Sequence, residues 1–260
     1  MEIRSVFGAI CALYPLVVSL TIEGANVQAS GSQFWDVNRW VRCWLKSETR
    51  ESTQEIVAGF QSVRRVNRRP LALVRAGLLK RFFIGTVAGG KKVLYSLSPL
   101  GANLVQLPCH GPRRRNDEAV TVDFFVYHQL GINDIYCALK YHPIPLADTR
   151  LVRWASCDRP IDSHSSLKPD GYLEVQTSQK TVAAFLEFDL GHESLTVWKG
   201  KVEAYLRYAV SGEFEGVFHQ PQFRVIVVTD TERRREALRR ATAPITDKIF
   251  WFSTVGFHSS

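Results

Sequence analysis

The chain has 260 residues, 45% of them hydrophobic and 22% charged, which is ordinary for a globular protein and enough to bury a core without disulfide staples. Its five cysteines are scattered and include no CxxC pair, which argues against a disulfide framework or a zinc knuckle and suits a reducing cytoplasm. The net charge of +8 and the pI of about 9.4 indicate an acidic partner.

The first notable segment is the apolar run "FGAICALYPLVVSL", residues 7–20, followed by a signal-peptidase-like "VQA" at 27–29. The run contains Pro15 and is too short for a membrane span. A targeting segment remains the alternative, but we expect a buried or interface segment in an unprocessed cytoplasmic protein with no membrane partner.

The next segment is strongly basic. Residues 39–115 hold 16 Lys or Arg and 3 Asp or Glu, a net +13, which leaves −5 for the rest of the chain. The periodicity predicts a helix over 34–46, a helix opening on the capping-box pair Ser52 and Glu55, and an arginine-rich helix over 62–81. A hairpin with a Gly89-Gly90 turn and a short helix follow. This order is typical of a winged helix.

A winged helix uses its third helix and its hairpin to bind double-stranded DNA. Arginine suits both contacts because its guanidinium forks onto phosphate or guanine. The predicted DNA-binding residues are therefore Arg64, Arg65, Arg68, Arg69, Lys91 and Lys92. A winged helix used for protein contact is the alternative, and Pro70 should kink or split the arginine-rich helix.

The pattern changes after residue 109. Residues 109–121 are rich in Gly, Pro and mixed charge and predict a linker. From residue 122 the predicted order is α-β-β-β-α-β-α-β, with strands at 150–156, 170–176, 181–190, 222–230 and 248–254.

Carboxylates lie in or beside two of these strands. Side chains alternate across a strand, so Glu187 and Asp189 share one face, and a hairpin would bring Asp170 beside them. Three clustered carboxylates repel one another unless a cation or protons compensate. Hard cations prefer such oxygen ligands, which predicts a Mg²⁺ or Mn²⁺ site at these three residues.

This order and these residues resemble the PD-(D/E)XK nuclease superfamily. Pro169-Asp170 matches the PD element and Glu187 the second acidic position, but Asp189 stands where the pattern has lysine. Some members of that superfamily supply the lysine from the following helix, for which Lys199 and Lys201 are the candidates. The resemblance implies Asp170, Glu187, Asp189, Lys199 and Lys201 as catalytic residues.

A closer resemblance covers residues 35–253. The segments "HQLGINDIYCAL", "KPDGYLEV", "FLEFDLGHESL" and "RVIVVTDTERRREALRR" look like the plasmid replication-relaxation family. Glu193 stands at a further acidic position of the third segment, and His128 and Asp134 match polar positions of the first. The alternatives are a helix-edge histidine, a helix-internal hydrogen bond for Asp134 and a first-turn acid for Glu193.

The resemblance implies a DNA-binding protein of a plasmid or mobile element, with other replication or mobilisation proteins as partners. We expect a mixed α/β chain with an apolar segment over 1–33, a winged helix-turn-helix over 34–108, a linker over 109–121 and a restriction-endonuclease-like αβββαβ domain over 122–260. Two functions stay open, a metal-dependent DNA endonuclease or nickase and a non-catalytic regulator or scaffold with a degenerate nuclease fold. The sequence does not predict the oligomeric state.

Overall fold

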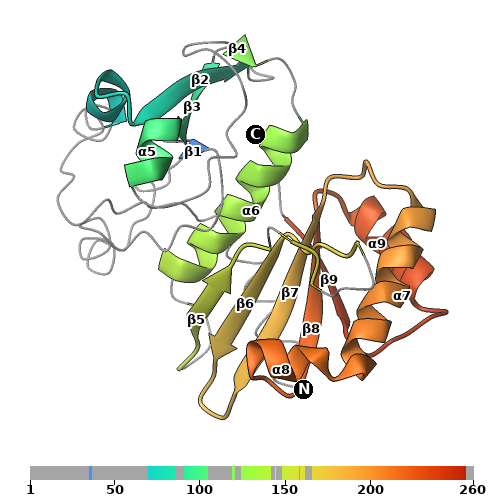
Figure 1. Ribbon diagram of the computed structural model, residues 1–260. Coiled ribbons are helices and arrows are strands. Elements are labelled where there is room, and N and C mark those ends of the chain that lie inside the picture. Colours follow the sequence, from blue (N-terminus) through green and yellow to red (C-terminus); the bar gives the residue numbers. More distant parts are fainter. Residues whose placement is uncertain are drawn as a thin grey trace. The chain divides into compact units, whose positions relative to one another are not determined.

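The computed structural model describes residues 35–36, 70–85, 91–104, 119–120, 124–141, 144, 148–157, 159–161 and 166–255. The chain is a mixed α/β protein whose described residues fall into two compact units, one within residues 16–141 and the other within residues 142–260 (Figure 1). The predicted mixed α/β class is confirmed at this level.

The first unit contains a four-stranded sheet in the order β1-β3-β2-β4. Strands β2 (Leu79–Gly85) and β3 (Lys91–Leu97) pair antiparallel and confirm the predicted hairpin. The preceding helix was predicted to reach residue 81, but its last helical residue is Arg75. Gly77 follows with a φ of 73°, a left-handed conformation that glycine adopts readily and that commonly ends a helix.

Two short strands were not predicted from the sequence. Strand β1 (Trp35–Asp36) pairs antiparallel with β3, although these residues were predicted to begin a helix. Trp35 lies opposite Tyr95 in the register of β1 and β3. Strand β4 (Ala119–Val120) pairs parallel with β2, although residues 109–121 were predicted as a linker. The other residues of the segments 34–46 and 109–121 lie outside the described ones.

Both helices predicted after the hairpin are present. Helix α5 (Pro99–Leu104) begins after Ser98, whose Oγ accepts from the Gly101 N–H at 2.9 Å. Helix α6 (Phe124–Tyr141) packs on the first sheet, because Val126 forms one buried cluster with Phe82 and Leu94. Helix α6 thus groups with the first unit, whereas the predicted boundary of the second domain lies at residue 122; that boundary stays a prediction.

The second unit is built on a five-stranded sheet in the order β5-β6-β7-β8-β9. Neighbouring strands pair antiparallel from β5 to β7 and parallel from β7 to β9. The strands are β5 (Arg150–Ala155), β6 (Gly171–Gln176), β7 (Thr181–Asp189), β8 (Phe223–Thr229) and β9 (Phe250–Thr254). The five strands predicted from the sequence are therefore confirmed.

Helices make the connections between the parallel strands. Helix α7 (Leu195–Ser211) and the short helix α8 (Glu213–Phe218), which was not predicted, join β7 to β8. Helix α9 (Glu232–Thr242) joins β8 to β9. Ser194 and Thr231 cap α7 and α9, since each side chain accepts from a backbone N–H in the first turn.

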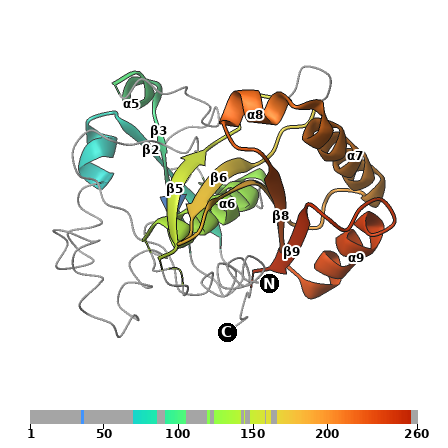
Figure 2. The ribbon, with the colours of Figure 1, turned by 90° about the horizontal axis from the view of Figure 1, so that it is seen from below.

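Helices α7 and α9 cover one face of this sheet (Figure 2). The Trp198 indole N–H of α7 donates to Thr242 Oγ1 of α9 at 2.9 Å, which ties the two helices together. Phe185 of β7 belongs to the core cluster on this face, together with Trp198, Tyr205 and Leu238. By strand alternation Glu187 and Asp189 point the same way as Phe185, toward the helices.

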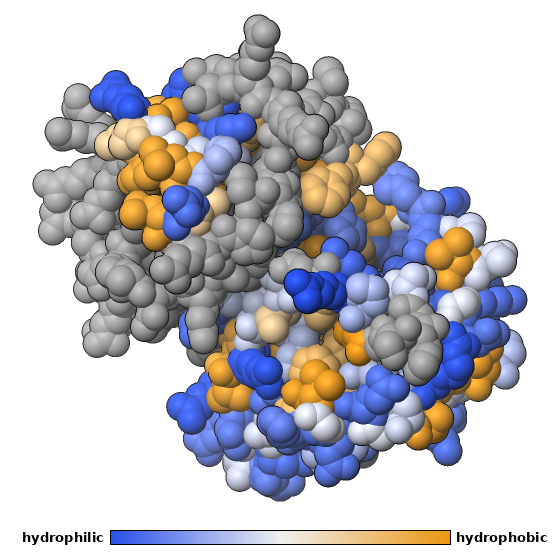
Figure 3. All heavy atoms as spheres, viewed as in Figure 1, coloured by the Kyte–Doolittle hydropathy of each residue, from blue (hydrophilic) through white to orange (hydrophobic). Residues whose placement is uncertain are grey.

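The described part of the chain offers no helix with both the length and the apolar character needed to cross a membrane. On the face seen in Figure 3, apolar residues of the second unit occur in small groups among hydrophilic ones. Such scattered apolar groups are usual for protein surfaces. The predicted apolar segment over 1–33 lies outside the described residues.

Candidate active site

Asp170 is placed by the pairing of β6 with β7. Gly171 lies opposite Leu186, so Asp170 precedes β6 at the level of Glu187. The Asp170 N–H donates to the Leu186 carbonyl at 3.0 Å, and the Phe188 N–H donates to Asp170 Oδ2 at 2.7 Å. These bonds fix the Asp170 carboxylate against β7. The antiparallel pairing predicted to bring Asp170 beside Glu187 is thus present.

Glu187 is a buried acid, with 3% of its surface exposed. Its Oε2 lies 3.0 Å from Lys201 Nζ, and its Oε1 accepts from the Tyr205 hydroxyl at 2.5 Å. Burial raises the pKa of Glu187 to about 7, the Lys201 charge opposes the rise and the Asp170 charge adds to it.

Lys201 bridges two carboxylates. Its Nζ lies 3.0 Å from Glu187 Oε2 and 3.0 Å from Glu193 Oε1. Burial alone would lower the pKa of Lys201, but the two carboxylates outweigh burial and raise it. The ammonium therefore stays charged at neutral pH. Tyr205 follows Lys201 by four residues, so both side chains lie on one helical face, whereas Lys199 is exposed.

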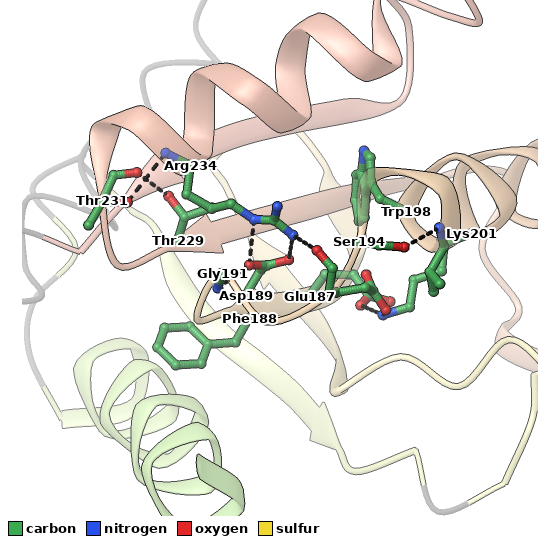
Figure 4. Close-up of polar contacts among 12 residues, drawn as sticks. Glu187, Phe188, Asp189, Gly191, Ser194, Trp198, Lys201, Thr229, Thr231 and Arg234 are labelled. Carbon is green, nitrogen blue, oxygen red and sulfur yellow. Dashed lines mark hydrogen bonds and ion pairs between the residues drawn. The ribbon is translucent and has the colours of Figure 1, made fainter.

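Asp189 is bound by an arginine of α9. Arg234 Nε donates to Asp189 Oδ1 at 2.8 Å and Arg234 Nη2 to Oδ2 at 2.7 Å, a bidentate pair (Figure 4). The Gly191 N–H also donates to Asp189 Oδ1, at 2.5 Å. Hydrogen bonding to Asp189 is the main cause that raises the pKa of Arg234. Asp189 lies on the same face of β7 as Glu187, but its carboxylate oxygens accept hydrogen bonds from Arg234 and from the Gly191 N–H.

The acids of this region differ in their fitness as metal ligands. Within the described residues, no group of three or more His, Cys, Asp or Glu side chains is arranged to hold a metal ion. Mg²⁺ is commonly bound through one or two carboxylates together with water and substrate phosphates. Asp170 and Glu187 lie at the same level of neighbouring strands and suit that donor set, with Glu187 also contacted by Lys201 and Tyr205, whereas Arg234 holds both oxygens of Asp189 in a bidentate pair. The three-carboxylate site and its cation stay a prediction.

Comparison with known proteins places the chain in a family. The model of the replication-relaxation family matches residues 44–220, more than half of the chain. The chain belongs to the replication-relaxation family. Family membership indicates a role in the replication and relaxation of plasmids, which involves DNA and the replication machinery. No curated protein and no solved structure matches the chain.

The match to the replication-relaxation family confirms the resemblance that the sequence motifs indicate. The matched segment includes Asp170, Glu187, Lys201 and Tyr205, and it ends before Arg234. Family membership does not by itself assign a role to any of these residues.

The other predicted residues belong to the first unit or lie outside the described part of the chain. His128 and Asp134 are on α6 in the first unit, where Asp134 is buried. Lys91 and Lys92 lie in β3, where their side chains are not described. The four predicted DNA-binding arginines, Arg64, Arg65, Arg68 and Arg69, lie outside the described residues. Their proposed roles remain predictions.

Two residues of the cluster escaped the sequence analysis. Tyr205 follows Lys201 by one helical turn, so the spacing alone could have indicated that both reach the same strand. Arg234 stands five residues after Thr229, which pairs with Asp189 across the parallel strands β7 and β8. Its position at the start of a helix after a buried strand is the only signal in the sequence, and four neighbouring arginines conceal it.

Proposed function

We propose that this protein binds double-stranded DNA of a plasmid or mobile element and cleaves it in a metal-dependent reaction. The observation that carries the proposal is the contact between Lys201 Nζ and Glu187 Oε2 at 3.0 Å. It supplies a partly buried cation beside the second acid of the motif, although Asp189 occupies the position where the nuclease pattern has lysine.

The roles follow from the contacts. Asp170 and Glu187 are the residues that would hold Mg²⁺ or Mn²⁺, and such an ion supplies activated water and charge stabilisation at phosphorus. Lys201 is held by Glu187 and Glu193 and keeps its positive charge where negative charge develops on the phosphate. The Tyr205 hydroxyl donates to Glu187 and fixes the orientation of that carboxylate.

DNA affinity is assigned to the basic N-terminal segment. Its net +13 over residues 39–115 is concentrated in the part of the chain predicted as a winged helix. Phosphate contacts supply most of the affinity of such proteins for DNA. In this proposal the second unit carries the residues for DNA cleavage, and the first unit supplies the affinity for DNA.

A second function is favoured by one observation. Asp189 is bound on both carboxylate oxygens by Arg234, which makes this part of the motif a structural ion pair. A non-catalytic DNA-binding regulator or assembly scaffold with a degenerate nuclease fold would retain such a pair without needing a metal. This alternative predicts DNA binding without cleavage.

The test is cleavage of supercoiled plasmid DNA with Mg²⁺ or Mn²⁺, compared with the same reaction in EDTA. The wild type should convert supercoiled plasmid to nicked or linear product only with the metal. Glu187→Gln should be inactive, and Glu203→Gln, which changes an exposed acid on α7, should cut like the wild type. No cleavage by the wild type would favour the scaffold, and equal cleavage by the wild type and Glu187→Gln would show that the reaction does not use this site.

A further inference from the structure

Arg234 differs from its neighbours in where its side chain goes. Arg235, Arg239 and Arg240 form ion pairs with Glu232 or Glu236 of their own helix α9. Arg234 instead leaves the helix and contacts the end of strand β7 (Figure 4). Its side chain is 14% exposed and that of Asp189 is 8% exposed. The pair is therefore largely shielded from water, where charge-assisted hydrogen bonds are strong.

The guanidinium of Arg234 joins the two ends of one loop. It binds both carboxylate oxygens of Asp189, the last residue of β7, and Nη2 also donates to the Glu193 carbonyl at 2.6 Å. Asp189 Oδ1 accepts in addition from the Gly191 N–H. Gly191 has a φ of 83°, which favours glycine and turns the chain sharply. The conformation of residues 189–193 thus depends on one arginine.

This loop determines where Glu193 lies. The Glu193 carbonyl is held by Arg234, while its carboxylate lies 3.0 Å from Lys201 Nζ. Ser194 follows directly and caps helix α7, which carries Lys201 and Tyr205. A displaced loop would move Glu193 away from Lys201 and would change the start of the helix that delivers the lysine.

We infer that Arg234 is a positioning residue of the proposed active site, acting through Asp189 and the backbone of Glu193 to hold Lys201 in place. The inference deepens the proposed function and rests on it for its catalytic consequence. It also explains the acid at position 189, where the motif has lysine, because the Asp189 carboxylate binds the guanidinium of Arg234 from α9. Lysine cannot replace the arginine, since one ammonium does not reproduce the planar fork.

The test compares Arg234→Gln and Arg234→Lys with Arg240→Gln, a matched loss of an exposed arginine that pairs within α9. The first readout is hydrogen exchange of the Gly191 amide in the metal-free protein. Both Arg234 variants should exchange about ten- to a hundredfold faster than the wild type, with unchanged exchange in β7 and β8. The second readout is the ¹H–¹⁵N signal of the Lys201 ammonium, assigned with Lys201→Met, which should weaken in both variants and persist in Arg240→Gln.

Cleavage kinetics form the third readout. The Arg234 variants should lower kcat about tenfold or more and leave KM for DNA unchanged, because Lys201 acts in the reaction and not in DNA affinity. Replacing Arg234 alone leaves the shielded Asp189 carboxylate without its ion-pair partner and could prevent folding. The double variant Asp189→Asn with Arg234→Gln removes that charge as well, so the same readouts can be measured in a folded protein. Unchanged Gly191 exchange and an unchanged Lys201 signal would overturn the inference even if the wild type cleaves DNA. Changed signals in a protein that never cleaves DNA would retain the positioning role and reject the nuclease.

Discussion

Lys201 Nζ lies 3.0 Å from Glu187 Oε2, although the two residues are 14 positions apart and belong to different elements, α7 and β7. In the nuclease pattern that this region resembles, the lysine follows the second acid by two residues on the same strand. Here Asp189 occupies that position, and the cation beside Glu187 is Lys201 of helix α7, which packs on one face of the sheet. An acid and a lysine thus lie in contact here, with the lysine on a different element from the one that the pattern predicts.

The burial of Glu187 makes stability depend on pH. Its pKa is raised from 4.5 to about 7, chiefly by burial. The folded state therefore binds more protons here than the unfolded state between pH 4.5 and about 7, and the free energy of unfolding falls as the pH rises through this interval. Relative to Glu187→Gln, wild-type stability should fall by about 1.4 kcal/mol per pH unit at the steepest point. Urea denaturation in EDTA measures this difference, and parallel pH profiles of the two proteins would contradict it.

Tyr205 and Glu187 should be coupled energetically. The Tyr205 hydroxyl is buried and donates to Glu187 Oε1, so Tyr205→Phe leaves a buried carboxylate with one donor fewer. Such a loss costs about 1–3 kcal/mol of stability. A double-mutant cycle with Glu187→Gln, measured by urea denaturation, should give a coupling energy above about 0.5 kcal/mol. Additive effects of the two substitutions would show that the hydrogen bond contributes nothing to stability.

Divalent metal should stabilise the folded protein. Asp170 precedes β6 at the level of Glu187, and an ion held by both carboxylates in the folded state would raise Tm by mass action. Calorimetry with and without Mn²⁺ should show this gain in the wild type, and Asp170→Asn or Glu187→Gln should remove it. Asp189→Asn tests the role of the third acid, and it should keep the gain because Asp189 serves Arg234. The same Mn²⁺ shift in all four proteins would rule out a site at these residues.

The predicted DNA-binding arginines can be tested together. Replacing Arg64, Arg65, Arg68 and Arg69 by alanine removes four of the positive charges in the basic segment. Affinity for duplex DNA should fall, and the slope of log affinity against log salt should flatten by roughly 0.9 for each phosphate that the variant no longer neutralises. Arg239→Ala with Arg240→Ala, which removes two positive charges from α9 of the second unit, is the control for a general loss of charge. Unchanged affinity of the quadruple variant would place the DNA contact elsewhere.

Much of the second unit could be predicted because its signals are local. Alternation put Glu187 and Asp189 on one face, and the apolar run of β8 indicated a strand within the sheet. The choice between Lys199 and Lys201 could not be made, because it depends on how α7 is rotated against the sheet. Arg234 was missed for a related reason, since the start of a helix is a weak signal that does not separate a largely shielded arginine from the others in "ERRREALRR".

The first unit shows where local signals mislead. Trp35 lies at the start of a predicted helix, yet it pairs with Tyr95 in a strand. Aromatic residues at helical spacing also suit a strand edge, and only the distant partner decides between them. The arginine-rich helix was predicted to continue past Gly77, whereas the left-handed φ of this glycine follows the last helical turn.

The central claim is that Lys201 supplies the cation missing from position 189, and single-turnover cleavage of plasmid DNA with Mg²⁺ tests it most directly. The variants are Lys201→Met and Lys199→Met, which remove lysines two residues apart on the same helix, one beside Glu187 and one exposed. The account predicts that Lys201→Met cleaves about a hundredfold or more slowly, since it loses a partly buried charge at the reacting phosphate, while Lys199→Met cleaves like the wild type. Cleavage by Lys201→Met at the wild-type rate, or an equal reduction of the rate in both variants, would contradict this claim.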